Sequence, residues 1–555
     1  MRIKLFAKTV WDLTFKQILF RIWYRAKPVL FLEKLFAKEG LVEGKVIDPQ
    51  TEFIKQSMDS KQSIKKRSFC FLNESVRFDA MIEWGFSGKG RLWTYNLHYF
   101  QYLNLGSIDE TKHARLLIRD WIAKNPVGLP DAWDPFPISL RLVNWIKFDV
   151  GRNILGEDRK IVTDSMTMQT RWLMKHLEYH LLGNHLFKNG KALVFMGVFF
   201  EGPEADKWLK KGIEIVSSEL DEQILGDGGH FERSPMYHSM ILEDCLDLIN
   251  ILGEKAGLLG EKLEQKADLM IGFLDAICHP DGRISLFNDA AFGIEAEPDQ
   301  LMAYYERVRG RRFEKKTCNI QALSETGYYI LAPDDENKMI IDCGPVGPDY
   351  QPGHSHCDTL SFELSVKARR VIVDSGCFQY VDSSIRTYNR GNIGHNTLTI
   401  DNENQSEVWG AHRCARKAKP LDIEWGDKDG RLYFRGGHDG YMRLKGKPVH
   451  SRTIEQDPQG WKIKDEVTGK GAHDVESRLH IHPSMTVHLM DGGVNIRFKG
   501  KPWLFVRPEG DLKIMVEKGW YCPEFGKKMP CAVLVLRVKN VELPFESGWQ
   551  LLMEQ

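Results

Sequence analysis

Three side chains able to bind metal or transfer protons lie at every second position near the start of Gly353–Leu364. They are His354, His356 and Asp358. Alternate residues of a β-strand lie on one face, so we expect these three side chains to share a pocket. Asp374 and His395 follow shortly afterwards in sequence that also favours strands. Three imidazoles and two carboxylates in one region predict a metal site combined with acid–base chemistry.

Polar and aromatic residues also cluster in the first half of the chain. Rings can stack on pyranose faces, while amides and guanidinium groups bind hydroxyls and carboxylates, so such clusters favour a sugar-binding cleft. The candidate substrate-binding residues are Arg91, Trp93, Tyr95, Asn96, His98, Trp133, Glu232, Arg233 and His238. The candidate catalytic residues in this half are Asn184, His185 and Tyr237.

The elements that position these residues fall into two regions that differ in the spacing of their apolar residues. Residues 79–322 show apolar residues at helical spacing, interrupted by Gly and Pro clusters, which predicts many consecutive helices. Residues 323–555 contain short β-rich runs bounded by turn residues, which predict an antiparallel β-sandwich. The chain is therefore expected to be an α+β multidomain protein, with a polar connector at residues 46–78.

Residues 1–45 are expected to form a basic amphipathic helical segment. They contain ten Lys/Arg and four Asp/Glu, and several apolar residues recur at roughly helical spacing. This pattern is typical of a helix that touches an anionic membrane surface or a partner, and equally of one packed on its own domain. No clear signal-peptide core is visible, so a cytoplasmic or membrane-peripheral location is expected.

The charge balance of the whole chain argues against one class of partner. Lys+Arg and Asp+Glu both total 76, so the net charge gives no reason to expect binding to nucleic acid. A polyanion would instead need a local basic cleft.

Six motifs occur in the order found in one family of polysaccharide lyases. They are WTYNLHYF, GNHLFKNG, ERSPMYHSM, GHSHCD, VIVDSG and GHNTL. On these motifs the chain resembles the heparinase II/III-like family over most of residues 80–550. The resemblance implies an N-terminal incomplete (α/α) toroid, a C-terminal antiparallel β-sandwich and an active cleft between them. It also implies cleavage of uronic-acid glycans by β-elimination, with heparan-type, alginate-type and bacterial capsular substrates all open.

The resemblance assigns roles to particular residues. Asn184, with His185 beside it, would neutralise the uronate carboxylate. Tyr237 and His354 would share the acid and base roles, in an order left open. His356, Asp374 and His395 would hold a structural Zn²⁺, with Asp358 as the alternative carboxylate ligand. Known family members are exported, so a periplasmic location is also possible by resemblance.

Two other classes of protein remain open from the sequence. One is a non-catalytic glycan-binding or assembly factor of polysaccharide production. The other is a glycoside hydrolase, which needs two carboxylates facing each other across the cleft. Glu232 and Asp134 are the candidates for that pair, although no motif supports it. Because the expected N-terminal segment differs from an export signal, a role in capsule or exopolysaccharide production is the favoured setting for the lyase.

Overall fold

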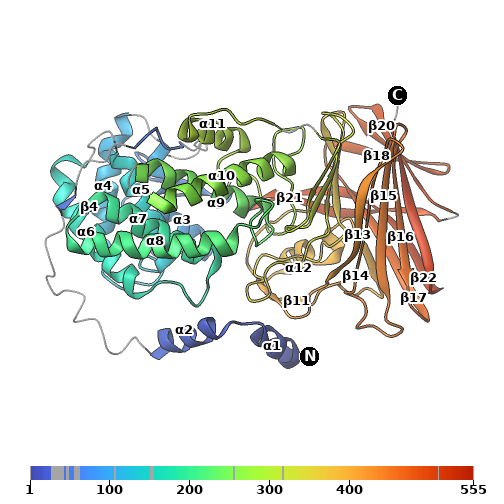
Figure 1. Ribbon diagram of the computed structural model, residues 1–555, viewed down its shortest axis with the longest axis horizontal. Helices are drawn as coiled ribbons and strands as arrows, with labels where there is room; N and C mark the ends of the chain where they lie inside the picture. Colours follow the sequence, from blue (N-terminus) through green and yellow to red (C-terminus); the bar gives the residue numbers. More distant parts are fainter. Residues whose placement is uncertain are drawn as a thin grey trace.

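A computed structural model describes residues 2–26, 43–44, 49–54, 63–105, 108–150, 155–253, 257–315, 318–510 and 512–553. Part of the predicted connector, at residues 46–48 and 55–62, and much of the expected N-terminal segment, at residues 27–42 and 45, lie outside these ranges. The helices occupy one end of the molecule and the large sheets the other (Figure 1).

The helical domain is built from amphipathic helices that surround a shared apolar core. The longest segments predicted to be helical correspond to α4, α5 and α9, and helices α5, α7 and α9 pack against one another. The α-helices are α1 (Arg2–Trp11), α2 (Phe15–Ala26), α3 (Arg91–Tyr99), α4 (Ile108–Lys124), α5 (Pro135–Asp149), α6 (Arg159–Lys175), α7 (Gly183–Phe199), α8 (Pro203–Gln223), α9 (Pro235–Leu252), α10 (Gly257–Ile277), α11 (Pro298–Arg309) and α12 (Ser384–Arg390).

The second domain consists of two antiparallel sheets with an apolar core between them. One sheet has the order β21-β22-β17-β9-β8-β7-β6-β5, with β10 paired to β17. The other has the order β13-β14-β15-β16-β23-β20-β19-β18. Their strands are β5 (Ile320–Leu323), β6 (Tyr328–Leu331), β7 (Lys338–Asp342), β8 (Phe362–Val366), β9 (Arg369–Ile372), β10 (Leu398–Ile400), β13 (Pro420–Lys428), β14 (Arg431–His438), β15 (Val449–Asp457), β16 (Gly460–Thr468), β17 (Ala472–Ile481), β18 (Met485–Met490), β19 (Gly493–Phe498), β20 (Lys501–Pro508), β21 (Ile514–Glu524), β22 (Lys527–Glu542) and β23 (Phe545–Met553).

Shorter strands form three small pairs outside these sheets. They are β1 (Glu43–Gly44) with β4 (Phe200–Glu201), β2 (Ser68–Phe71) with β3 (Glu74–Arg77), and β11 (Val408–Trp409) with β12 (Arg413–Cys414). The hairpin β2–β3 lies inside the region predicted to be a connector, yet Phe69 is fully buried. Its turn residue Asn73 donates to the Phe525 carbonyl, so the hairpin packs where the two domains meet.

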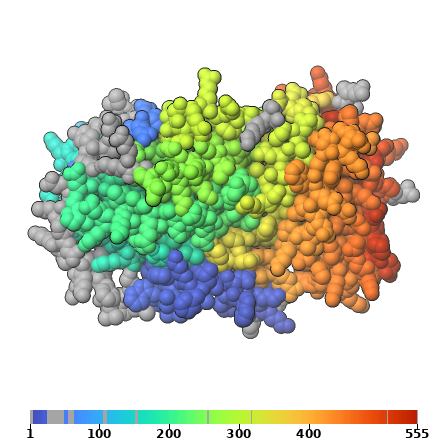
Figure 2. Space-filling model, viewed as in Figure 1, coloured from blue at the N-terminus to red at the C-terminus, as the bar shows by residue number. Residues whose placement is uncertain are grey.

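The expectation of an α+β protein with a toroid followed by a sandwich is confirmed. The helical domain ends with α11 at Arg309 and the first sandwich strand begins at Ile320. Helices α1 and α2 lie apart from both cores and run along one side of the molecule, beneath the junction of the two domains (Figures 1 and 2).

Candidate active site

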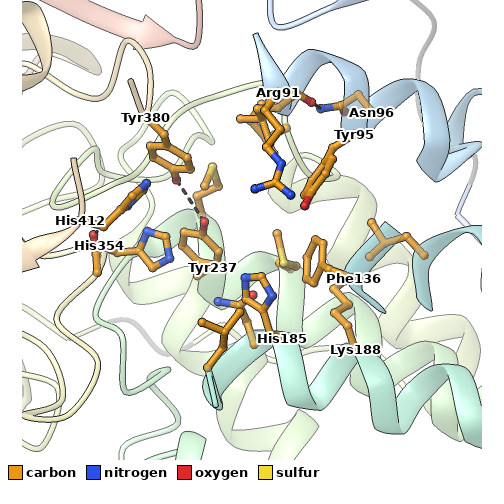
Figure 3. A pocket seen from close by; sticks show the side chains of 18 of the residues that line it. Arg91, Tyr95, Asn96, Phe136, His185, Lys188, Tyr237, His354, Tyr380 and His412 are labelled. Atoms are coloured by element: carbon orange, nitrogen blue, oxygen red, sulfur yellow. Dashed lines mark hydrogen bonds between the residues drawn. The ribbon is translucent and has the colours of Figure 1, made fainter. Parts of the chain in front are cut away.

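A cleft of about 1600 Å³ opens between the toroid and the sandwich. Its walls include side chains from α3, α5, α7 and α9, and the loops that carry His354, Tyr380 and His412 close it on the sandwich side (Figure 3). The candidate catalytic residues Asn184, His185, Tyr237 and His354 all line this one cleft. The structure therefore brings together residues that lie up to 170 positions apart in the sequence.

The start of α7 fixes the position of Asn184 and His185. Leu182 and Gly183 both have positive φ, at 64° and 57°, so the chain turns sharply into the helix. A Cβ on Gly183 would lie 2.4 Å from Oε1 of Gln351 and 2.7 Å from Oε1 of Glu232. Only glycine fits this close approach, which is why the helix begins directly before the two polar side chains.

Tyr237 is held in the first turn of α9, two residues after the helix-starting Pro235. Its ring centroid lies 4.1 Å from that of His354, and its hydroxyl is 3.1 Å from the hydroxyl of Tyr380 (Figure 3). Burial, together with the nearby carboxylates of Glu232 and Asp289, raises the pKa of Tyr237 well above its usual value. The phenol therefore keeps its proton at neutral pH and is suited to donate it.

Asp289 orients His354 and was not assigned to the catalytic chemistry by sequence reasoning. Its Oδ2 lies 3.0 Å from Nδ1 of His354, and its Oδ1 lies 2.8 Å from Nε2 of His356. Burial opposes ionisation, but the Arg386 guanidinium and these hydrogen bonds hold the pKa of Asp289 well below its usual range. Because a carboxylate only accepts hydrogen bonds, Nδ1 of His354 donates to Asp289, and Nε2 of His354 lies 3.7 Å from Oε2 of Glu232.

Asn184 rests on a buried carboxylate. Its Nδ2 donates to both oxygens of Glu232, at 3.0 and 3.1 Å, and Glu232 is only 2% exposed. The structure thus places Glu232, predicted to bind substrate, behind Asn184. Beside it, Nδ1 of His185 is 3.0 Å from Oε1 of Glu178. Burial alone would lower the pKa of His185, but Glu178 outweighs it and the pKa is raised.

Arg91, Tyr95 and Asn96 line the cleft as predicted. The guanidinium of Arg91 binds Asp131 at 2.7 Å and Asp134 at 2.8 Å, and the Tyr95 hydroxyl donates to Asp134 at 2.5 Å. Asp134 is therefore already bonded to a cation and a phenol, and Glu232 lies behind Asn184. Neither carboxylate is presented to the cleft as a hydrolase pair would require.

Besides Glu232, five residues predicted to bind substrate do not line the cleft, and this part of the prediction is wrong. Three of them belong to the core of the toroid, because they lie on the inward faces of their elements. The Trp93 indole donates to the Glu74 carbonyl, and the Trp133 indole donates to the Asn125 carbonyl. Nδ1 of His98 accepts from the indole of Trp121.

The other two stabilise the backbone instead of facing the cleft. Arg233 has a positive φ of 55°, and its guanidinium donates to the carbonyls of Phe231, Glu325 and Thr326. Nε2 of His238 bonds to the Met270 carbonyl, which ties α9 to α10. In both cases the side chain, which the motif predicted to bind substrate, is instead hydrogen-bonded to backbone carbonyls of neighbouring segments.

The expectation of a strand through His354, His356 and Asp358 is also wrong. These residues lie in an irregular loop, and β8 begins only at Phe362. Their hydrogen bonds run to the loop after α10 instead of to a neighbouring strand. The His356 amide donates to Oδ1 of Asn288, and Asp358 accepts from the Asn288 amide. The two histidines still converge, because both bind Asp289.

A second cluster, of two histidines and an aspartate, lies next to the loop that carries His354 and has the side chains of a metal site. One ligand atom each from His356, Asp358 and His395 lie within 4.8 Å of one another, and all three residues are buried. Within the part of the chain that the structure describes, Nδ1 of His356 and Nε2 of His395 are buried without hydrogen-bond partners, which leaves both nitrogens available to bind a cation. Two imidazoles and a carboxylate match the ligand preferences of Zn²⁺.

Asp374, the carboxylate predicted to bind the metal, lies 2.7 Å from Nδ1 of His395. In this geometry it orients the histidine, whereas Asp358 is the carboxylate grouped with the two imidazoles. The alternative that the sequence left open is therefore the one that the geometry favours.

Comparison with known proteins agrees with this architecture. The heparinase II/III N-terminus family model matches residues 69–309, and the heparinase II/III-like C-terminal model matches residues 315–550. These two matches cover the toroid and the sandwich almost completely. The chain belongs to the heparinase II/III-like family.

Individual relatives are distant in sequence. A heparin-sulfate lyase of Pedobacter heparinus is 26% identical over 328 residues, which are 51% of this chain and 47% of that protein. One from Bacteroides stercoris is 25% identical and covers 52% of this chain and 50% of its own length. The matches thus span about half the length of these curated relatives. A crystal structure of heparinase III superposes with a TM-score of 0.68 at 20% identity, over 87% of this chain and 81% of that chain, which shows a shared fold.

Proposed function

We propose that this protein is a polysaccharide lyase that cleaves a uronic-acid-containing glycan by β-elimination. The observation that carries the proposal is the face-to-face placement of Tyr237 and His354 in the cleft, next to Asn184. A phenol that retains its proton and an imidazole whose Nδ1 donates to Asp289 form a matched acid and base. The heparin-sulfate lyases among the relatives support the same reaction class.

The reaction begins at the weakly acidic C5 proton of the uronate. In our proposal Nε2 of His354 removes this proton, and Asp289 stabilises the imidazolium that forms. Electrons then move to form the C4=C5 double bond while the C4–O4 bond breaks. Tyr237 donates its phenolic proton to the leaving O4 and recovers a proton after product release. We assign the base role to His354 because burial raises the pKa of Tyr237 and so disfavours the tyrosinate.

The uronate carboxylate is expected to bind at the start of α7. Backbone N–H groups and the positive end of the helix dipole favour an anion there, and the Glu232 carboxylate already accepts from the backbone and side-chain amides of Asn184. His185 adds a group whose pKa is raised by Glu178, so it carries positive charge over a wider pH range. Together with the Asn184 side chain, these groups stabilise the negative charge that develops when C5 loses its proton.

We propose a structural Zn²⁺ held by His356, His395 and Asp358, with Asp374 orienting His395. When bound, the ion neutralises the buried carboxylate and fixes the loop that carries His354. His356 is positioned for this role because its Nε2 is held by Asp289 while its Nδ1 is free.

The setting that we propose is bacterial capsule or exopolysaccharide metabolism, with a cytoplasmic or membrane-peripheral location. The basic N-terminal helices support a membrane contact. No described helix is both long and apolar enough to cross a bilayer. Fractionation of cells with an antibody against the protein tests the location, and analysis of surface glycans after deletion of its gene tests the setting. Export of the protein with unchanged glycans would contradict both.

The decisive experiment measures ultraviolet absorbance while the purified protein acts on a panel of uronate polysaccharides. β-Elimination creates a double bond conjugated to the carboxylate, so absorbance rises with turnover. We expect this rise in the native protein and its loss in Tyr237→Phe, while Tyr433→Phe in strand β14 serves as the matched control. New reducing ends without absorbance would instead indicate hydrolysis. Binding without cleavage of any glycan would indicate a non-catalytic glycan-binding factor.

A further inference from the structure

Helices α1 and α2 connect the two domains along one edge of the cleft. Thr9 accepts a hydrogen bond from the Trp409 indole at 3.2 Å, and Asp12 binds Lys417 at 2.6 Å, so α1 and the turn after it are fixed to the sandwich. The Tyr24 hydroxyl donates to the Leu177 carbonyl, which fixes α2 to the toroid. Both helices precede residue 69, where the family matches begin. This helix pair is therefore an addition to the region that the family models describe.

Several apolar residues of the helix pair form part of the cleft wall. Phe6, Val10, Leu13, Ile18 and Ile22 line the cleft together with the catalytic residues. Figure 2 shows the pair, in dark blue, lying across the junction of the two domains. A glycan that enters the cleft on this side would therefore pass next to these helices.

The outer face of the pair is an apolar stripe without cover from the described residues. Trp11 is 87% exposed, Phe15 78%, and Leu19 and Trp23 each 51%. Phe15, Leu19 and Trp23 follow at intervals of four, so they share one side of α2. None of these four residues lines the cleft. Phe15, Leu19 and Trp23 on one side of α2, together with Trp11 at the end of α1, exceed the scattered exposure that is normal for a soluble surface.

The helices that carry this stripe have mainly positive charge. Residues 2–26 contain six Lys/Arg and one acidic residue, Asp12, which Lys417 already neutralises. Lys4 and Lys8 on α1 are exposed. Tryptophan beside lysine is the composition that favours the interface of an anionic bilayer, where the ring sits among the headgroups and the cation meets the lipid phosphates.

We propose that Trp11, Phe15, Leu19 and Trp23 form a docking surface for an anionic lipid bilayer, which we call the lipid-facing stripe. Because Ile18 and Ile22 of the same helix α2 line the cleft, docking holds the mouth of the cleft next to the lipid surface. The substrate class that fits this placement is a uronate glycan still attached to a membrane lipid. This extends the membrane contact proposed above and does not depend on the lyase reaction.

Vesicle binding of the full-length protein tests the stripe directly. We expect co-sedimentation with vesicles of phosphatidylcholine and phosphatidylglycerol, weaker binding in high salt, and little binding to pure phosphatidylcholine. The double variant Trp11→Ser/Trp23→Ser should bind at least tenfold more weakly. Trp425→Ser removes a 43% exposed tryptophan from the sandwich and is the matched control.

Two results would overturn the proposal. One is equal vesicle binding by the double variant and the native protein, or no binding by the native protein. The other is a dimer of the native protein that the double variant abolishes, which would assign the stripe to a second copy of the chain. Vesicle binding is measured without glycan, so its failure is distinct from a failure of the lyase assay. Cleavage of a soluble glycan should be the same in both proteins.

Discussion

Asp289 binds His354 with one carboxylate oxygen and His356 with the other, at 3.0 and 2.8 Å. One buried side chain thus joins the candidate base to a candidate metal ligand. The Arg386 guanidinium, itself 1% exposed, donates to both oxygens of the same carboxylate. The acid–base pair and the metal cluster are consequently one connected network.

Replacement of Asp289 by Asn should reduce turnover strongly. The amide oxygen can accept from only one histidine at full strength, and it can no longer stabilise a charged His354. Loss of the comparable carboxylate in catalytic triads costs about 10⁴-fold in kcat, so we expect a fall of about 100-fold or more. Rates at saturating substrate measure it, and Asp299→Asn at the exposed start of α11 is the control. Activity within threefold of the native protein would remove Asp289 from the mechanism.

Metal content should distinguish the two carboxylates near His395. If Asp358 is the ligand and Asp374 the orienting residue, Asp358→Asn should abolish bound zinc, while Asp374→Asn should weaken binding about 10- to 100-fold. Elemental analysis of the purified proteins after dialysis is the measurement. Asp401→Asn, which disturbs another histidine–aspartate pair at His473, is the control. Complete loss of zinc only in Asp374→Asn would reverse the two roles.

Tyr380 should tune the acid without being essential. Its hydroxyl is 3.1 Å from that of Tyr237, and this hydrogen bond lowers the pKa of Tyr237 against the larger effect of burial. Tyr380→Phe removes the bond but keeps the ring, so we expect kcat to fall about tenfold with little change in KM. A pH profile of kcat that is identical to that of the native protein would show that Tyr380 acts only by packing.

Glu219 should make stability depend on pH. It is 3% exposed, and burial raises its pKa from the usual 4.5 to about 7. The folded state therefore binds the proton more tightly than the unfolded state, and stability is lost as the pH rises from about 4.5 to 7. Glu219→Gln should raise the free energy of unfolding at pH 8 by about 1 to 3 kcal/mol and leave it unchanged near pH 4.

Urea unfolding at the two pH values is the measurement for Glu219→Gln. Glu214→Gln, which alters an exposed carboxylate on the same helix α8, provides the matched control. An equal gain at pH 4 and pH 8 would show that the effect comes from packing and not from ionisation.

The sequence predicted much of the architecture because both kinds of periodicity are strong. The helical spacing in residues 79–322 matches helices such as α4, α5 and α9, and the short β-rich runs in residues 323–555 match strands such as β6, β7 and β14. The clustering of Asn184, Tyr237 and His354 was also anticipated from the motifs. The error at Trp93 and His98 has a simple origin: polar and aromatic residues of one motif occupy both faces of α3, and only one face meets the cleft.

Asp289, Tyr380 and Arg386 were missed because their roles arise only from tertiary contacts. Asp289 lies 65 residues before His354 and follows no recognisable strand alternation. The available signal was the polar pair Asn288-Asp289 directly after an apolar run, since such a pair in a folded core needs partners. Arg386 gave a weaker signal, because a single arginine in a polar segment is normally solvated.

The division of the candidate catalytic residues between two domains has a consequence for how activity should be interpreted. Asn184 and Tyr237 come from the helices, whereas His354 and Tyr380 come from loops of the sandwich. Neither domain contains a complete acid–base pair, so we expect neither domain to be active on its own. Catalytic turnover is therefore a sensor of domain assembly. A change that displaces one domain relative to the other, by even the length of a hydrogen bond, should lower the turnover rate before any unfolding can be detected.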